Sequence, residues 1–466
     1  MIDPRAAQPT RIMHYNQTGS ELFAANRRRL KSSLPPNSLA VLNSNDVPPT
    51  NADGTLAMPA NSDLFYLSGV QQEQSILLLY PDADDEKQRE ILFLREPTPE
   101  NELWEGHKLT KDEARARTGI QSIHWLPDFP RLFHRLMCEC EHVYLNSNEH
   151  KRAVIEAETR EARFVADTLR RYPLHDYRRL APLMHQLRAV KSEMELTLIR
   201  KAAAITADGF RRVLKFTRPG VRENEIEAEF AHEFIRRRAR FAYLPIIAGG
   251  ANACCLHYVA NSNVCRPGEL LLLDVGAAHE NYNADMTRTI PVSGRFTRRQ
   301  RQVYDAVLWV LRQCVQGLRP GVKPKDWQKD AEQMIEKQLV NLGLLTVRQI
   351  KRQDPDNPAF KKYFMHGVGH PLGLDVHDVG ITTQPIQAGW VMTVEPAIYI
   401  REEGFAVRLE NDVLVTDKGP VDLMDGVPIE AEEIEDLMKL RPKSRSSNGP
   451  SHEPLRRNRI TELTRR

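Results

Sequence analysis

The stretch that decides the fold of this chain is residues 270–289, which read LLLLDVGAAHENYNADMTRT. Four leucines lead into Asp274, and Asp285 opens a second strand-like segment eleven positions later. The residues between them, HENYN at 279–283, favour a turn. A hairpin closed there would place the two aspartates on adjacent strands, where facing Cβ atoms lie about 4.5–5.5 Å apart. That spacing suits two metal ions roughly 3.5–4 Å apart, as in two-metal hydrolases.

Three further candidate ligands follow later in the chain. His370 ends the glycine-rich segment HGVGH, Glu395 follows a strand-like run, and Glu410 follows another alternating strand. Carboxylates at positions that would otherwise be core are costly unless they are paired or bind a metal. Each acid taken alone also fits an ordinary charge at a strand end, but the ordered set of five favours a metal centre. Four carboxylates and one imidazole form a hard shell that suits Mn²⁺, with Co²⁺, Fe²⁺ or Zn²⁺ as alternatives.

An internal repeat organises the second half of the chain. Capping boxes at Ser192 and Thr297 each begin a long helix. The motif RPGV ends the first helix at 218–221 and ends the second 101 residues later. Each stop precedes an amphipathic helix, expected at 223–238 and 325–342, and then strands that carry the candidate ligands. The repeat predicts pseudo-twofold symmetry, with the site where the two halves meet.

The first part of the chain alternates short apolar runs with helical patterns, which predicts an α/β domain with a mixed sheet. The expected strands are 39–42, 75–80, 91–94 and 142–145, and helical patterns cover 18–33, 110–117, 128–139 and 153–171. By composition, the segment 61–69 indicates a turn that leads into a strand. A length of 466 residues favours two domains. We expect the first at 12–178 and the second at 179–440, followed by a flexible basic tail at 441–466.

Composition excludes several other classes of protein. The formal net charge of +3 gives no reason to expect a nucleic-acid or membrane partner, although the basic tail leaves an acidic partner as a weaker alternative. No apolar run approaches the roughly 20 residues of a transmembrane helix, and the first residues lack the apolar region of a signal peptide. The six cysteines include no Cys-x-x-Cys pair. We interpret them as reduced thiols of a cytoplasmic protein.

The motifs above resemble those of aminopeptidase P, a family of the pita-bread metallopeptidases that also include prolidase and methionine aminopeptidase. The resemblance spans about residues 12–440. It is carried by segments 256–258, 274–297, 366–380, 393–396 and 408–410. It implies an aminopeptidase P-type domain at 12–178 and a pita-bread catalytic domain at 179–440, α/β (α+β) in class. One departure is Asn411, where the family usually has an acid. Because Glu410 is kept, we expect an adjustment around that ligand rather than loss of the site.

The resemblance implies a metallo-aminopeptidase that hydrolyses the N-terminal Xaa-Pro bond of peptides and releases the first residue. Asp285 and Glu410 would bridge two divalent ions, most simply Mn²⁺. Asp274 would complete the shell of one ion, and His370 and Glu395 would complete that of the other. A hydroxide activated by both ions would attack the peptide carbonyl. Glu395 would act as general base and then as proton donor to the leaving proline nitrogen.

The same resemblance assigns catalytic and substrate-binding roles around this centre. His257, His366 and His377 would shape the pocket and donate hydrogen bonds to the substrate or to the tetrahedral intermediate. Arg408 lies two residues before the last ligand and so shares its strand face, where we expect it to pair with a site carboxylate or the substrate terminus. Trp104 resembles a tryptophan that reaches a neighbouring subunit's substrate pocket, which implies a dimer or tetramer. Taken singly, each of these residues also fits a structural role.

Two other functions stay open at this point. A prolidase would share the metal centre but would close its pocket beyond the proline to hold the free carboxylate. A pita-bread protein that has lost catalysis would act only as a binding module, although the complete set of ligands argues against this. Metal content and hydrolysis with added Mn²⁺ separate an enzyme from a binding module.

Overall fold

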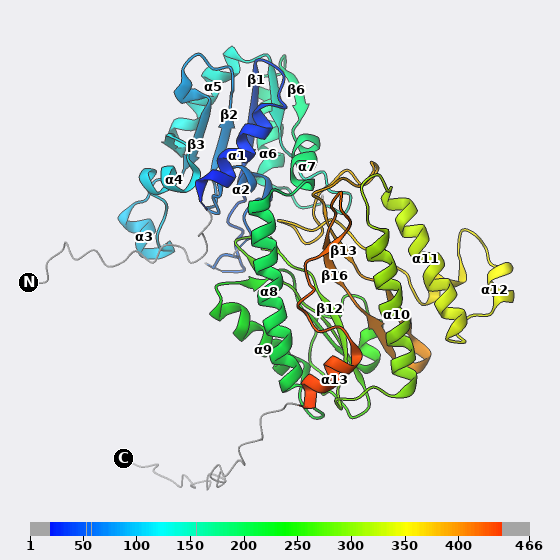
Figure 1. The fold of residues 1–466 in the computed structure, drawn as a ribbon. Helices are drawn as coiled ribbons and strands as arrows, with labels where there is room; N and C mark the ends of the chain where they lie inside the picture. Colours follow the sequence, from blue (N-terminus) through cyan, green and yellow to red (C-terminus); the bar gives the residue numbers. More distant parts are fainter. Residues whose placement is uncertain (1–18, 53, 57, 155, 440–466) are drawn as a thin grey trace, which may run out of the picture.

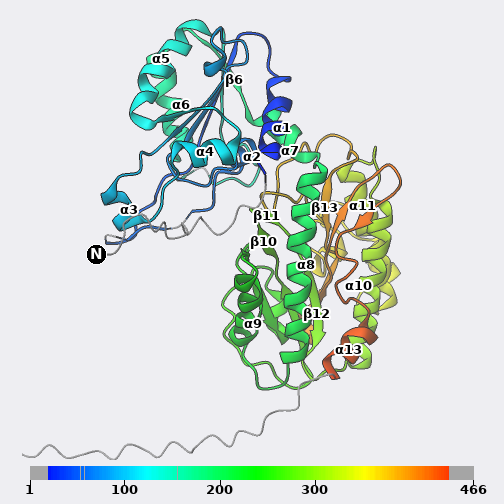
Figure 2. The ribbon, with the colours of Figure 1, turned by 60° about the vertical axis from the view of Figure 1, so that its left-hand side comes forward.

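The computed structural model describes residues 19–52, 54–56, 58–154 and 156–439. The basic tail expected at 441–466 lies outside the described residues. The described chain forms two units, with the N-terminal unit at one end of the C-terminal unit (Figures 1 and 2). Within the described ranges, no helix has both the length and the apolar character needed to cross a bilayer.

The N-terminal unit is built on a six-stranded mixed sheet with the order β4-β3-β2-β1-β5-β6. Its strands are β1 (Ser38–Asn43), β2 (Ile76–Leu79), β3 (Glu90–Leu94), β4 (Ser122–Trp125), β5 (His142–Leu145) and β6 (Asp176–Arg179). Strand β1 pairs antiparallel with β2 and parallel with β5. Because side chains alternate along a strand, Leu39 and Val41 enter one apolar cluster and Ala40 and Leu42 enter another. The sheet is therefore buried on both faces.

Most helices of the N-terminal unit lie where the sequence predicted them. They are α1 (Ser20–Lys31), α2 (Ser62–Ser68), α3 (Pro99–Glu105), α4 (Lys111–Thr118), α5 (Phe129–Glu139) and α6 (Arg160–Arg171), with short 3₁₀ turns η1 (Glu86–Gln88) and η2 (Leu126–Asp128). The four expected strands are confirmed, but the edge strands β4 and β6 were missed because they lack a continuous apolar run. The helix expected from residue 153 begins only at Arg160.

The prediction of a turn and strand at 61–69 is wrong, because the segment forms helix α2. The side chain of Asn61 accepts hydrogen bonds from the backbone N–H groups of Asp63 and Leu64, at 3.1 and 3.0 Å. This is an N-cap, which begins a helix by satisfying amides that have no partner inside it. The side chains from Leu64 to Ser68 are buried beneath the N-terminal sheet and α1, so packing completes what the cap begins.

The helices of the C-terminal unit confirm the predicted repeat of two helices followed by strands. They are α7 (Ala181–Ala189), α8 (Glu193–Phe216), α9 (Glu223–Arg236), α10 (Arg298–Gly317), α11 (Pro324–Asn341), α12 (Val347–Lys351) and α13 (Ala431–Lys439), with 3₁₀ turns η3 (Gly250–Cys254), η4 (Ala359–Lys362) and η5 (Arg401–Glu403). Both capping boxes are formed, at Ser192 and at Thr297. Helix α8 packs on α9, and α10 packs on α11.

The two RPGV turns make the same contacts in each half of the repeat. Gly220 and Gly321 have φ angles of 92° and 91°, a region that strongly favours glycine. The N–H of Gly220 donates to the carbonyl of Cys265 at 2.9 Å, and that of Gly321 donates to the carbonyl of Ile386 at 2.9 Å. Equivalent turns therefore anchor equivalent helix pairs, which supports the internal symmetry.

The strands of the C-terminal unit form four small sheets, with the orders β12-β9-β8, β13-β16-β17, β14-β15 and β11-β10-β7. Their bounds are β7 (Arg240–Phe241), β8 (Ile246–Gly249), β9 (Leu270–Asp274), β10 (Ala277–His279), β11 (Tyr282–Asn283), β12 (Thr287–Pro291), β13 (Val391–Val394), β14 (Ala397–Ile400), β15 (Phe405–Arg408), β16 (Asn411–Leu414) and β17 (Val421–Asp422). The halves join where Glu410 N–H donates to the carbonyl of Thr287, at 3.0 Å. Strands of both halves share one apolar core with the helices.

Candidate metal centre

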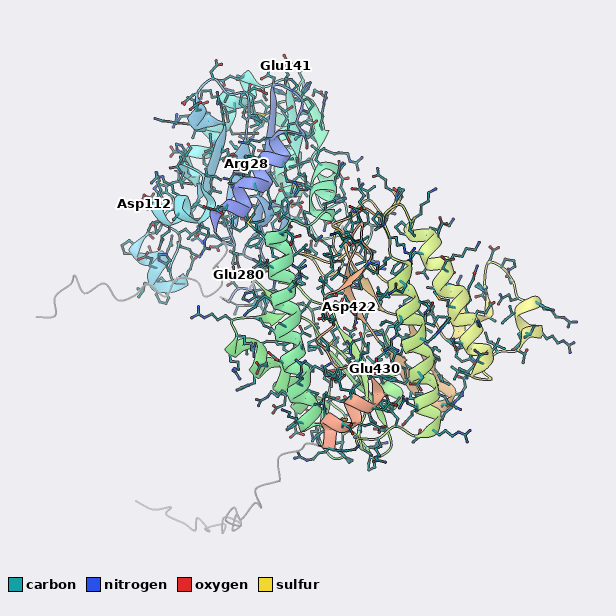
Figure 3. The ribbon with its side chains drawn as sticks, in the orientation of Figure 1. Arg28, Asp112, Glu141, Glu280, Asp422 and Glu430 are labelled. Carbon is teal, nitrogen blue, oxygen red and sulfur yellow. The ribbon has the colours of Figure 1, made fainter. Side chains whose placement is uncertain are left out.

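The hairpin that carries the two aspartates differs in one respect from the prediction. Strand β9 pairs antiparallel with β12, and the ribbon continues through β10 and β11 to a turn at Glu280 and Asn281; Glu280 is labelled in Figure 3. Asp274 lies opposite Thr287 in this ladder, while Asp285 lies two residues before Thr287. The aspartates are therefore diagonal neighbours on one face rather than a directly facing pair.

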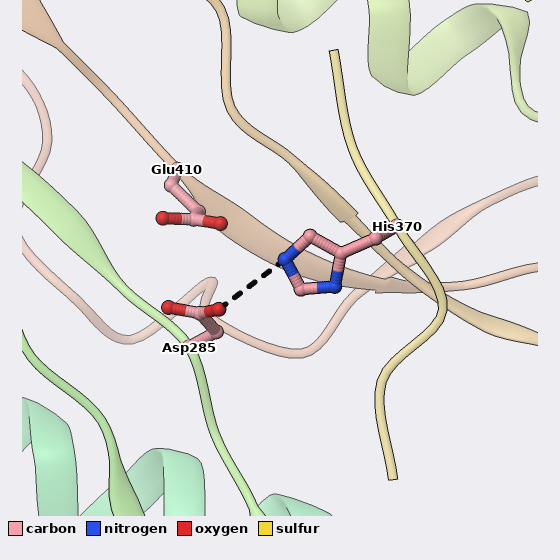
Figure 4. Close-up of side chains that lie close together, drawn as sticks. All are labelled: Asp285, His370 and Glu410. Carbon is pink, nitrogen blue, oxygen red and sulfur yellow. Dashed lines mark ion pairs between the residues drawn. The ribbon is translucent and has the colours of Figure 1, made fainter. Parts of the chain in front are cut away.

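Three of the expected ligands form a compact cluster, shown in Figure 4. Asp285, His370 and Glu410 each offer one ligating atom, and these atoms all lie within 4.8 Å of one another. His370 Nε2 lies 3.5 Å from Asp285 Oδ2. The residues come from three places: the segment before β12, the loop before β13, and the join between β15 and β16. Asp285 and Glu410 lie in short connections between strands, whereas His370 lies in the long segment between η4 and β13.

The other two expected ligands adjoin this cluster. His370 Nε2 lies 3.7 Å from Glu395 Oε1, just beyond the end of β13. The Tyr243 hydroxyl contacts Oδ1 of Asp274 at 2.5 Å and Oδ1 of Asp285 at 2.6 Å. The structure therefore brings all five residues together, although residues as distant in sequence as Asp274 and Glu410 contribute.

His370 is oriented to ligate through Nε2. Its Nδ1 lies 3.0 Å from the carbonyl oxygen of Pro371, to which an Nδ1–H donates. That bond fixes the ring with Nε2 turned toward Asp285, so Nε2 would be the ligating atom once a cation takes the place of its proton, an arrangement common in histidine metal ligands. Burial alone lowers the pKa of His370, but the hydrogen bond to Asp285 and the charge of Glu395 outweigh it and raise the pKa to about 9.

The carboxylates are buried together and lack enough positive charge from the protein. Burial raises the pKa of Asp274, and it raises that of Glu395 to about 7. Burial also raises the pKa of Glu410, and the neighbouring charge of Asp285 adds to the effect. Within the described part of the chain, Glu410 Oε1 is buried without a hydrogen-bond partner. Crowded acids and an open oxygen ligand fit divalent cations, which would offset the repulsion.

Arg408 lies beside the centre, as the sequence predicted. Its guanidinium forms an ion pair with Asp274 and donates hydrogen bonds to the Tyr399 hydroxyl at 2.8 Å and to Thr287 Oγ1 at 3.1 Å. Thr287 Oγ1 in turn donates to Glu410 Oε2 at 2.7 Å. Arg408 therefore orients Asp274 directly and Glu410 through Thr287.

Two of the three predicted histidines flank the centre. His366 contacts the Tyr399 hydroxyl through Nε2 at 2.9 Å, and its Nδ1 lies 3.7 Å from Glu395 Oε2. The ring of His377 stacks on that of His370, with centroids 4.0 Å apart. Burial and the charge of Arg408 lower the pKa of His366 to about 4. The pKa of His377 is also lowered to about 4, by loss of water around the ring and by the charge of His370, although part of this side chain is exposed. Neutral imidazoles can both donate and accept hydrogen bonds.

The remaining predicted site residues lie farther out. From the sequence we expect His257 on a strand-like segment at 255–258, but it lies instead in an exposed turn after η3. It is still close enough for its charge to lower the pKa of His366. Trp104 is 79% exposed on α3 of the N-terminal unit. Trp104, Arg95 and Lys108 line one cavity, and none of the five expected metal ligands lies in it. Within one chain, Trp104 therefore does not reach the metal centre.

Several functional contacts were missed by the sequence analysis. Tyr243 contacts two of the acids, Tyr399 connects His366 to Arg408, and Asp412 accepts a hydrogen bond from the backbone N–H of Asp285 at 3.1 Å. None lies in a motif that signals metal chemistry, because each reaches the centre through tertiary packing. A cavity of about 290 Å³ opens beside the centre and is lined by His370, His377, Arg152, His185 and Trp327 among others.

Comparison with known proteins bears on this arrangement. Residues 23–144 match the aminopeptidase P N-terminal domain, and residues 197–417 match metallopeptidase family M24. The Xaa-Pro aminopeptidase of Haemophilus influenzae is 34% identical over 436 residues, which cover 90% of this chain and 97% of that protein. The Escherichia coli K12 enzyme of the same name is 32% identical over 435 residues, covering 89% and 97%. A structure of Zn-substituted E. coli aminopeptidase P in complex with product gives a TM-score of 0.82 at 31% identity, covering 92% of this chain and 100% of that chain.

Proposed function

The chain belongs to the aminopeptidase P family of M24 metallopeptidases and is a hydrolase, and from that premise we propose that it releases the first residue from peptides with proline in second position. The observation that carries the proposal is the buried cluster of Asp285, His370 and Glu410, with Asp274 and Glu395 beside it. A peptidase needs an activated water and a stabilised oxyanion, and this donor set suits both needs when metal is bound.

We assign the five residues as ligands of two divalent cations, most simply Mn²⁺. Asp285 and Glu410 would contact both ions, Asp274 one of them, and His370 and Glu395 the other. When bound, the cations would supply Lewis acidity and lower the pKa of a water at the site. The oxygen-rich shell favours Mn²⁺, with Co²⁺, Fe²⁺ or Zn²⁺ as alternatives.

The protein's own groups would move the protons. Glu395, which lies beside His370 Nε2 and His366, would take a proton from water and later give it to the proline nitrogen. His366 lies beside Glu395 Oε2 and the Tyr399 hydroxyl, so it would hold a hydrogen bond to the oxygen of the former carbonyl. His257, His377 and Arg408 would line the substrate pocket and contact the peptide.

Proline sets the substrate class, because an Xaa-Pro bond is a tertiary amide without an N–H. The pocket therefore needs no hydrogen-bond acceptor facing the nitrogen of the second residue, and it needs only room for the pyrrolidine ring. We further propose domains at 12–178 and 179–440 and a cytoplasmic location. A dimer or tetramer would bring the exposed Trp104 of one subunit to the pocket of another.

A peptide series tests the proposal against a dipeptidase. We expect kcat/KM with Mn²⁺ to be higher for Ala-Pro-Ala and longer Ala-Pro peptides than for Ala-Pro, with only the first residue released. Replacing the second-position proline by leucine should remove most of the activity. Mass spectrometry of the products reports which bond is cut. Cleavage of Ala-Pro without action on longer peptides would assign the chain as a prolidase, and no cleavage of any peptide would leave it a binding module.

A further inference from the structure

A buried ionic cluster joins the N-terminal unit to the loop that carries His377. Arg188 on α7 donates from Nη1 to Asp63 Oδ1 at 2.8 Å, and from Nη2 to Asp375 Oδ2 at 2.6 Å and Asp378 Oδ1 at 2.5 Å. Lys191 Nζ donates to Asp378 Oδ2 at 3.0 Å. Two cations thus bind three carboxylates, one of them from α2 in the N-terminal unit. The side chains of Arg188, Lys191 and Asp378 are at most 3% exposed.

The cluster acts on the loop at 371–380 from both sides of His377. Asp375 lies two residues before His377, and Asp378 lies immediately after it. Asp375 Oδ1 also accepts from the Ser62 hydroxyl at 2.8 Å, a second bond from α2. With both carboxylates held, the backbone that carries His377 has little freedom to move.

Local packing shows that the loop is built around this cluster. A Cβ added at Gly373 would lie 2.1 Å from Asp378 Oδ2 and 3.0 Å from Lys191 Nζ, so only glycine leaves room for the ion pair. The amide of Asn283, from the hairpin that carries Asp285, donates to the carbonyls of Gly373 and Leu374 at 3.0 and 2.9 Å. The loop is therefore clamped between the N-terminal unit and the aspartate hairpin.

Three of the five charged side chains, Arg188, Lys191 and Asp378, are buried, whereas Asp63 and Asp375 are 14% and 48% exposed. Burying charge is a costly way to join two domains, because apolar side chains of the same volume often serve at least as well for stability. What ion pairs add is direction, since each one defines a single geometry. The groups so directed lie next to a histidine whose ring stacks on His370 at 4.0 Å between centroids. The ion pairs of Asp375 and Asp378 therefore lie beside a ring whose displacement would change its stacking on His370.

We infer that Arg188 is a positioning residue, which holds the His377 ring over His370 through Asp375 and Asp378 and which couples this geometry to the N-terminal unit through Asp63. The inference rests on the proposed function for its kinetic consequence, but the positioning itself is a property of the folded chain. It assigns the N-terminal unit a part in shaping the site of its own subunit.

The first test measures loop order in the full-length, metal-free protein. In Asp378→Asn the shape is kept while the charge is lost, so hydrogen exchange at 371–380 should become roughly tenfold faster or more. Carbethoxylation of His377, followed by peptide mass spectrometry, should change in rate as well. Tyr66→Phe is the matched control, because it removes the hydrogen bond from Tyr66 to the Leu187 carbonyl (3.2 Å), which joins the same helix α2 to α7 without touching the loop. Equal exchange in Asp378→Asn, Tyr66→Phe and the parent chain would overturn the inference.

Should Asp378→Asn fail to fold, Asp63→Asn replaces it, because Asp63 is 14% exposed at the edge of the cluster. This variant lies in the N-terminal unit and touches no proposed ligand or substrate residue. It should accelerate exchange at 371–380 in the same direction, by a smaller factor. A response confined to α2, with the loop unchanged, would show that the cluster only joins the domains.

The second test asks whether the effect on catalysis runs through His377. Asp378→Asn should lower kcat by about tenfold or more at unchanged metal content and with little change in KM, because small misplacements of a catalytic group are expensive. In a His377→Ala background the same substitution should change kcat by less than about twofold. If Asp378→Asn lowers kcat by the same factor with and without His377, the ionic cluster has a purely structural role. If the parent chain cleaves no peptide, the proposed function fails, while hydrogen exchange still decides the positioning.

Discussion

The imidazole rings of His370 and His377 lie nearly parallel, with centroids 4.0 Å and planes 24° apart. They are nevertheless held in different ways. His370 binds the Pro371 carbonyl through Nδ1 and turns Nε2 toward Asp285. His377 contacts Nη1 of Arg152 through Nδ1, at 2.7 Å. The stacked pair therefore combines one imidazole that is oriented to bind metal with one that covers it on the side of the cavity.

Removing a carboxylate that contacts both cations should abolish the metal centre. We expect Asp285→Asn and Glu410→Gln each to eliminate peptidase activity and to lower bound Mn²⁺ to one ion or none. The reason is that such a carboxylate offsets the repulsion between the two cations. Metal analysis of the purified variants, beside peptide turnover, checks this. Near-normal turnover with two metals bound would contradict the ligand assignment.

The histidines beside the centre should behave differently from His370. His366→Ala and His377→Ala are expected to retain bound metal but to lose roughly 10²-fold in turnover, because each would remove a hydrogen bond to charge that develops in the transition state. In the peptide-free site its nitrogens contact the Gly367 carbonyl and the Tyr399 hydroxyl, so the peptide oxygen would have to replace one of these contacts for His366. Loss of metal from either variant would make that histidine a ligand.

Tyr243 is expected to tune the centre through its hydroxyl, which contacts both Asp274 and Asp285. Tyr243→Phe removes these contacts and should weaken Mn²⁺ binding by roughly 10- to 100-fold, the usual effect of losing a partner of a metal ligand. Isothermal titration with Mn²⁺ measures the change. Tyr304→Phe is the matched control: that buried hydroxyl donates to the Ile429 carbonyl at 2.6 Å, and its loss should leave the affinity unchanged.

The two hydrogen-bond partners of Asn411 explain why an amide fits at this position, where the family usually has an acid. Its side chain accepts from Arg288 Nη2 at 2.7 Å and donates to Asp422 Oδ2 at 2.6 Å; Asp422 is labelled in Figure 3. Asn411→Asp would set two carboxylates against each other and should destabilise the fold by about 1–3 kcal/mol. Adding Asp422→Asn restores a donor and should recover most of the loss. Urea unfolding near neutral pH measures the free energy of unfolding of the single and double variants. If the two substitutions destabilise the fold additively, the pairing of Asn411 with Asp422 is contradicted.

Glu161 should make the stability of the N-terminal unit depend on pH. Burial raises the pKa of Glu161 to about 7, although the backbone and side-chain amides of Asn43 donate to its carboxylate at 2.8 and 3.0 Å. Its ordinary pKa is 4.5, so the folded state binds more protons between these values. Stability from this group is therefore complete below about pH 4.5 and is lost as pH rises through about 7.

Glu161→Gln isolates this effect, because glutamine keeps the shape and carries no charge. The difference in unfolding free energy between parent and variant should shift in favour of the variant by about 2–3 kcal/mol from pH 5 to pH 8, since one pKa unit corresponds to about 1.4 kcal/mol. Thermal or urea unfolding across that range measures the shift. A pH-independent difference would show that Glu161 stays ionised in the folded protein.

Local sequence determined the elements that carry the site. The leucine run before Asp274, the capping boxes at Ser192 and Thr297, and the glycine stops are formed by neighbours in sequence, so their patterns predict them directly. The order of the five ligands, with the family resemblance, was enough to predict a metal centre. Segment 61–69 was misread because an N-cap and burial, rather than composition, make it a helix.

Only the tertiary structure decided which distant groups surround those ligands. Tyr243 meets Asp274 from 31 residues away, and Arg408 meets it from 134. Arg188 meets Asp63 from 125 residues away and Asp378 from 190. No periodicity encodes such pairs, because a tyrosine or arginine in a buried segment looks the same whether it touches a ligand or only the core. Their roles arise when folding removes water from between them, so that charge and hydrogen bonding must be satisfied within the protein.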